Sequence, residues 1–226
     1  MAPNIQTEIA TLKGHIVYLG TVVEENLQCA IKALLEKNSE LAYQVMQTDR
    51  VEVDALEIDV EEACLRIMAL HQPVASDLRF LVTVLKVNSD LERIGDLVAK
   101  IADKVLLLYK LDPVKFLSDS MQVPEMFNGM FEKTLCMFRQ AMEAFINEDT
   151  DLAYKVCLAD DEVDKAKRTI SDELEEIIMT TPAQHIYLAK LLSVARSTER
   201  IADHCTNICE DIIYMQQGKI IRHKKV

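Results

Sequence analysis

One short pattern occurs twice in the chain, as Glu92–Asp96 (ERIGD) and again, 107 residues later, as Glu199–Asp203 (ERIAD). An earlier pattern, Leu41–Val45 (LAYQV), recurs 111 residues later as Leu152–Val156 (LAYKV). Two matches in the same order and at nearly the same offset indicate an internal duplication. The chain is therefore predicted to contain two copies of one structural unit.

Pro73 and Pro182 mark the same place in each copy, where a new helix would begin. Gly and Pro are scarce, with 5 of each in 226 residues, which argues against a many-stranded sandwich or barrel because such folds need frequent turns. The apolar residues between the breaks recur at helical spacing. Six helices are predicted, over residues 5–37, 40–70, 74–110, 123–147, 151–179 and 183–217.

Long helices joined by short connections pack antiparallel to their neighbours. The longest break, residues 111–123, falls at the middle of the chain and separates three helices from three others. We therefore predict an all-α fold of six long helices in two repeated three-helix bundles. The first repeat is expected in residues 1–112 and the second in residues 113–226.

The formal net charge is −12, from 37 Asp and Glu against 25 Lys and Arg. An acidic chain is a poor binder of nucleic acid and a better partner for metal cations and basic protein surfaces. No apolar stretch is long enough to span a bilayer, and the first residues show no signal-peptide pattern. We therefore expect a cytoplasmic protein whose six cysteines stay reduced.

Carboxylates line one stripe of the third helix in each repeat, on the side opposite the apolar residues. The stripes consist of Glu92, Asp96 and Asp103 in the first repeat and of Glu199, Asp203, Asn207 and Glu210 in the second. Asp160 and Asp164, four residues apart on the preceding helix, would present a further acidic edge to the second stripe. These nine residues are the candidate metal ligands.

Like charges four residues apart destabilise a helix unless solvent or a cation screens them. An oxygen-rich set without imidazole suits Mg²⁺, Mn²⁺, Ca²⁺ or iron. The alternative is that the stripes are ordinary solvated charge on helix surfaces. The spacing leaves both interpretations open.

Motifs of catalytic sites are missing from the sequence. It contains no Gly-rich phosphate loop, Gly-x-Ser-x-Gly or His-Glu-x-x-His motif, and the Glu-x-x-His element of di-iron carboxylate proteins is absent. Cys205 and Cys209 fall on the apolar face of their helix and are predicted to be core residues. We expect a protein that is not an enzyme, with a carboxylate-metal enzyme and a metal-free structural bundle as the alternatives.

Three segments carry a family resemblance: Gln72–Arg79 (QPVASDLR), Asp90–Asp96 (DLERIGD) and Thr198–Glu210. They resemble PhoU, the phosphate-transport regulatory family of bacteria and archaea, over essentially the whole chain. The resemblance implies two three-helix bundles with a surface multinuclear metal site at each Glu/Asp-x-x-x-Asp motif, holding iron, zinc, manganese or magnesium. It assigns the stripe residues, with Asp160 and Asp164, as the ligands.

One departure from the family pattern lies in the first repeat. Asp160–Asp164 carries the family's Asp-x-x-Val-Asp element, whereas Arg50 stands at the matching position before Val53 and Asp54. Asp49 is one residue away from that position. The first metal site is therefore expected to be weaker than the second or differently built.

The resemblance also implies a regulatory role. Members of this family resemble cytosolic adaptors, here expected to be a homodimer, that link the ATPase of a phosphate ABC transporter to a sensor histidine kinase. Such an adaptor restrains the phosphate-starvation response, and the transcription that it controls, when phosphate is plentiful. It would reach the membrane only through these partners and would not bind nucleic acid.

Overall fold

The computed structural model of the protein describes residues 4–112, 116, 123–180 and 184–218. Over these ranges the chain is helical without a strand, as predicted. The helices are α1 (Ile5–Leu35), α2 (Ser39–Thr48), the π-helix η1 (Asp49–Val53), α3 (Asp54–His71), α4 (Ala75–Leu111), α6 (Met126–Asn147), α7 (Thr150–Thr180) and α8 (His185–Gln217). The expected helix start at residue 183 lies outside the described residues, as does residue 113, the expected start of the second repeat.

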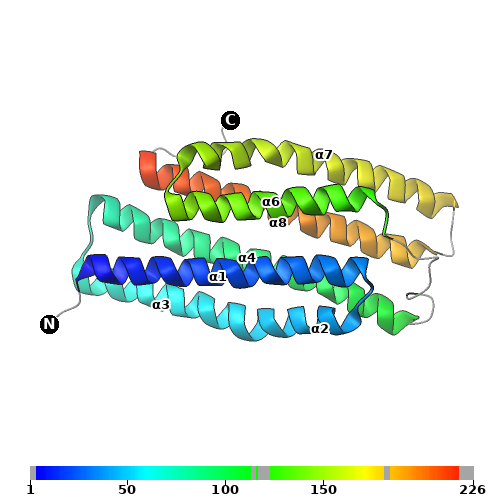
Figure 1. Cartoon of the computed structure of the whole chain (residues 1–226), viewed down its shortest axis with the longest axis horizontal. Coiled ribbons are helices and arrows are strands. Elements are labelled where there is room, and N and C mark those ends of the chain that lie inside the picture. Colours follow the sequence, from blue (N-terminus) through cyan, green and yellow to red (C-terminus); the bar gives the residue numbers. More distant parts are fainter. Residues whose placement is uncertain (1–3, 113–115, 117–122, 181–183, 219–226) are drawn as a thin grey trace.

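The helices form two bundles that lie side by side (Figure 1). Helices α1 and α4 and the α2–η1–α3 segment make up the first bundle, and α6, α7 and α8 make up the second. Successive long helices run antiparallel, as their short connections require. The prediction of two three-helix bundles is confirmed.

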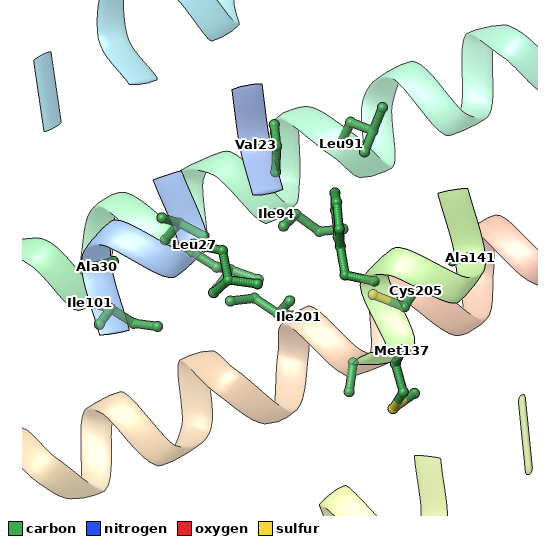
Figure 2. Close-up of a cluster of buried hydrophobic side chains, with 14 of the residues drawn as sticks. Val23, Leu27, Ala30, Leu91, Ile94, Ile101, Met137, Ala141, Ile201 and Cys205 are labelled. Carbon is green, nitrogen blue, oxygen red and sulfur yellow. The ribbon is translucent and has the colours of Figure 1, made fainter. Parts of the chain in front are cut away.

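One hydrophobic core runs through both bundles. Figure 2 shows its middle, where buried side chains of α1, α4, α6 and α8 meet: Val23, Leu27, Ala30, Leu91, Ile94, Ile101, Met137, Ala141, Ile201 and Cys205. The rings of Phe80 and Phe145 also stack across the two bundles, with centroids 6.4 Å apart. The bundles therefore share their apolar interior, and α2, α3 and α7 lie on its outer sides.

Polar contacts reinforce the pairing of α4 with α8. Lys86 Nζ lies 3.1 Å from Oδ1 of the buried Asp211, and His204 Nδ1 lies 2.7 Å from Asp90 Oδ1. Each contact joins residues from different repeats, so these side chains fix the register between the two bundles.

The second helix of the first repeat differs from its prediction. The spacing predicts one continuous helix over residues 40–70, but a π-helical turn separates α2 from α3. In this turn the N–H of Asp54 donates to the carbonyl oxygen of Asp49, five residues back. A π-turn accommodates one more residue than an α-turn and is frequent at functional sites. The matching helix of the second repeat, α7, is continuous.

Candidate metal centres

Four carboxylates from α7 and α8 come together in the second repeat: Asp160, Asp164, Glu199 and Asp203. We call them the second acidic cluster. Burial, then the charges of Asp203, Asp164, Asp161 and Glu199, raise the pKa of Asp160 to about 7. Burial and the charges of Glu199 and Asp164 also raise the pKa of Asp203. The Asp160–Asp164 pair and the Glu199–Asp203 pair, both predicted from the spacing, therefore face each other across adjacent antiparallel helices.

Four carboxylates assemble in the same way in the first repeat: Asp49 and Asp54 from the π-helical turn and α3, and Glu92 and Asp96 from α4. We call them the first acidic cluster. Asp49 is buried, with 9% of its surface exposed. Burial, followed by the charges of Asp96, Asp54 and Glu92, raises the pKa of Asp49 to about 7. Burial likewise raises the pKa of Glu92, and Asp96 and Asp54 add to the increase.

The π-helical turn makes the first cluster differently built from the second, which is one of the two expectations drawn from Arg50. Asp49 and Asp54 are five residues apart, whereas Asp160 and Asp164 are four apart. Because the turn between Asp49 and Asp54 is π-helical, both carboxylates reach the same cluster despite the extra residue. Arg50 is exposed and is not among the charges that act on Asp49 or Glu92. The first cluster is thus as complete as the second, and Asp49 and Asp54 are site residues that sequence reasoning did not assign.

A glycine on α4 makes room for the buried carboxylate. A Cβ atom on Gly95 would lie 2.6 Å from Asp49 Oδ1 and 3.2 Å from Val53 Cγ1. Such a separation is far below van der Waals contact, so any side chain at position 95 displaces Asp49. The second repeat has Ala202 at the matching position. Gly95 is therefore a specific requirement of the first cluster.

Three of the predicted ligands lie outside the two clusters. Asp103 forms an ion pair with Lys104 at 2.9 Å and is not among the charges that act on Asp49 or Glu92. Asn207 donates its amide to Asp90 Oδ1 at 3.4 Å, across the contact between the repeats.

Glu210 is not among the charges that act on Asp160 or Asp203, whereas its charge does act on the thiols of Cys157 and Cys209. Cys205 and Cys209 are fully buried, as predicted for core residues. Helical periodicity placed Glu210 on the acidic stripe of α8. The carboxylates of α7, Asp160 and Asp164, lie opposite only part of that stripe.

Basic side chains partly neutralise both clusters. Arg93 Nε lies 3.3 Å from Glu92 Oε2, and Lys100 Nζ lies 3.9 Å from Asp96 Oδ2. In the second repeat, Lys167 Nζ lies 3.7 Å from Glu199 Oε1. These pairs are partly exposed and span 3.3 to 3.9 Å, so they compensate only part of the repulsion among the carboxylates.

The clusters fit a hard cation in ligand type and in charge. All of their donors are carboxylate oxygens, and one of them, Asp160 Oδ1, is buried with no hydrogen-bond partner in the described part of the chain. No three His, Cys, Asp or Glu side chains of that part are placed closely enough to hold one ion in their present rotamers. A cation held by three of these carboxylates would therefore require them to adopt other rotamers.

Comparison with known proteins places this architecture in a family. The family model described as PhoU domain matches the chain twice, over residues 16–105 and 127–212. Each match contains one acidic cluster. The chain belongs to the PhoU family, and the resemblance read from the sequence is confirmed.

Related chains match along nearly their whole length. PhoU homolog 1 of Thermotoga maritima, named a phosphate-specific transport system accessory protein, is 33% identical over 220 residues, covering 96% of this chain and 90% of the relative. The accessory protein PhoU of Escherichia coli is also 33% identical, covering 97% and 88%. The crystal structure of PhoU from Pseudomonas aeruginosa superposes with a TM-score of 0.86 at 31% identity, covering 96% of this chain and all of the other.

These relatives are named accessory proteins rather than enzymes, which agrees with the expectation that the chain is not an enzyme. None of the helices described for the chain combines the length and apolar character needed to cross a membrane.

Proposed function

We propose that this protein is a non-catalytic, metal-binding regulator of phosphate uptake and homeostasis. Membership of the PhoU family and the name of the related accessory proteins support the link to a phosphate-specific transport system. One observation supports the metal-binding part of the proposal: each repeat contains a cluster of four carboxylates. In both repeats the cluster is built from the second and third helices. Repulsion among the four carboxylates of each cluster destabilises the folded protein unless a cation offsets it.

The cation would act by controlling the charge of a surface. Asp54 and Asp203 are exposed, so an ion bound at either cluster stays accessible to a partner. Bound cations reduce the negative potential of the cluster and offer open coordination positions to acidic or carbonyl groups. Metal loading would therefore change which partner surfaces are attracted, because charge complementarity governs specificity and association rate.

The partners in this proposal are the ATPase of the phosphate ABC transporter and a sensor histidine kinase. The protein would act in the cytoplasm as a homodimer and restrain the phosphate-starvation response when phosphate is plentiful. The cations considered are iron, zinc, manganese and magnesium, because carboxylate ligands accept all four and availability helps to decide among them.

A binding assay with the purified transporter ATPase tests this function. The full chain is loaded with Mn²⁺ or stripped with chelator, and its affinity for the ATPase is measured beside that of Glu199→Gln/Asp203→Asn. Asp172→Asn/Glu176→Gln is the matched control, because it removes two exposed carboxylates of α7 outside the clusters.

The proposal expects metal-dependent binding in wild type and control, and weaker metal-dependent binding in the cluster variant. Equal binding by all three proteins, with and without metal, contradicts the proposal.

A further inference from the structure

The two acidic clusters match residue for residue, but their immediate surroundings do not. Three residues after Asp54 stands Glu57, whereas three residues after Asp164 stands Lys167. Both positions lie on the helix that faces the cluster, one turn beyond its second carboxylate. The duplication thus places opposite charges at one structural position.

In the first repeat, Glu57 is part of an oxygen-rich extension of the cluster. Asn88 of α4 donates its amide to the carbonyl oxygen of Glu57 at 2.9 Å and to Glu57 Oε1 at 3.4 Å. Asn88 is 1% exposed, and its Oδ1 is buried without a hydrogen-bond donor in the described residues. Burial and the charges of Glu61, Glu92 and Asp54 raise the pKa of Glu57. The first cluster is therefore extended by a carboxylate on which the charge of Glu92 acts and by an unpaired amide oxygen one helical turn before Glu92 on α4.

In the second repeat, the positions of Glu57 and Asn88 are taken by the ammonium group of Lys167 and the methyl group of Ala195. Lys167 Nζ lies 3.7 Å from Glu199 Oε1, the residue that matches Glu92. The residue that matches Asn88 is Ala195, which has no side-chain oxygen to offer. The ammonium group of Lys167 is therefore paired with a carboxylate that a cation at the second cluster would use.

We propose that Glu57 and the Asn88 Oδ1 make the first acidic cluster the tighter of two divalent-cation sites, and that Lys167 is an internal counter-ion that weakens the second. The inference rests on the proposed metal binding, and it differs from the sequence-based expectation of a first site that is weaker than the second or differently built. Exchanging Glu for Lys changes the local charge by two units, of which Lys100 beside Asp96, matched by the neutral Asn207 in the second repeat, offsets one. A cation must also displace Lys167 from Glu199 before it can use that carboxylate.

The consequence is an ordered response to cation concentration. The cation site of the first repeat is occupied at low cation concentration and stays occupied. The site of the second repeat is occupied only at higher cation concentrations, so its occupancy changes over that range. An adaptor with two such sites can keep one ion for structure and use the other as a signal.

Calorimetric titration with Mn²⁺ of full-length variants that keep one cluster each tests the difference. Asp160→Asn/Asp164→Asn leaves the first cluster, and Asp49→Asn/Asp54→Asn leaves the second. Lys167→Gln is then added to the variant with the second cluster, and Glu57→Gln to the variant with the first. The controls Lys165→Gln and Glu62→Gln make the same charge changes at exposed positions of the same helices.

We expect the first cluster to bind Mn²⁺ at least tenfold more tightly than the second. Lys167→Gln should strengthen the second site, and Glu57→Gln should weaken the first, each by about ten- to a hundredfold, as for residues that support metal ligands. The two controls should change neither site. Thermal unfolding in chelator verifies that every variant is folded.

Equal affinities of the two clusters, or no effect of Lys167→Gln and Glu57→Gln, overturn this inference and leave the proposed function intact. No Mn²⁺ binding by wild type overturns the metal-binding function itself.

Discussion

Gly95 of α4 lies directly against the carboxylate of Asp49, so that a Cβ atom at residue 95 would be 2.6 Å from Asp49 Oδ1. The contact joins the π-helical turn to the helix that supplies Glu92 and Asp96. It explains how a buried carboxylate reaches the first acidic cluster, and it makes Gly95 a sensitive position for both stability and cation binding.

Gly95→Ala should displace Asp49 and weaken cation binding by the first cluster. Alanine is the better helix former by about 1 kcal/mol, but overpacking costs about 1–3 kcal/mol. Gly14→Ala is the control, because nothing lies within 4 Å of its Cβ position and the change should stabilise α1. Urea unfolding should place Gly95→Ala about 1–3 kcal/mol below Gly14→Ala in free energy of unfolding, and equal values for the two variants would contradict the contact.

The stability of the metal-free protein should fall as the pH rises from about 5 to 8. The pKa values of Asp49 and Asp160 are each raised to about 7 in the folded protein, against 3.8 in the unfolded chain. The folded state therefore binds more protons between these values, and its stability decreases with pH. The contribution is fully present below pH 3.8 and is lost as the pH passes through about 7.

Urea unfolding in chelator at several pH values measures this slope, and Asp49→Asn/Asp160→Asn should flatten it. Saturating Mn²⁺ should oppose the loss at high pH, because cations bind the deprotonated carboxylates. The opposite result would be a metal-free wild type whose stability rises between pH 5 and 8 while that of the double variant does not. It would show that repulsion among the clustered carboxylates does not destabilise the protein.

Removal of Lys86 should destabilise the contact between the repeats. Lys86 is the partner of Asp211, which is 1% exposed, so Lys86→Ala leaves a buried carboxylate with less compensation. We expect a loss of about 1–3 kcal/mol in the free energy of unfolding. Lys155→Ala, at an exposed position of α7, should cost far less, and similar losses in the two variants would argue that the ion pair contributes nothing.

The shared core predicts that both repeats unfold together. Ile201 is fully buried between the bundles, as Figure 2 shows, and Ile201→Ala should cost about 2–5 kcal/mol. Ile146→Ala, where the side chain is 42% exposed, should cost much less. Hydrogen exchange should report the loss equally in α1 and in α7, whereas a loss restricted to the second repeat would mean that the bundles unfold separately.

Helical periodicity and the duplication are sufficient to predict the fold, all four carboxylates of the second cluster and half of those of the first. Glu92 with Asp96, and Glu199 with Asp203, are each four residues apart on a regular helix, a spacing that sequence displays directly. Asp49 and Asp54 were not predicted as a pair because five residues separate them, and no regular α-helix places such residues on one face.

A signal for the π-helical turn was nevertheless present. Asp49 matches Asp160 at an offset of 111, whereas Val53 and Asp54 match Val163 and Asp164 at 110. One residue is therefore inserted between them, and a π-turn is how a helix absorbs a single insertion. The contact between Asn207 and Asp90 had no such signal, because it depends on how the two repeats pack.

Metal analysis of the purified protein tests the central claim, that the two acidic clusters hold divalent cations, most directly. Wild type is compared with the variant Asp49→Asn/Asp54→Asn/Asp160→Asn/Asp164→Asn and with the control Asp172→Asn/Glu176→Gln, each equilibrated with Mn²⁺ and desalted. The account predicts stoichiometric metal in wild type and control and almost none in the cluster variant. Equal metal content in all three, or none in any, would contradict it.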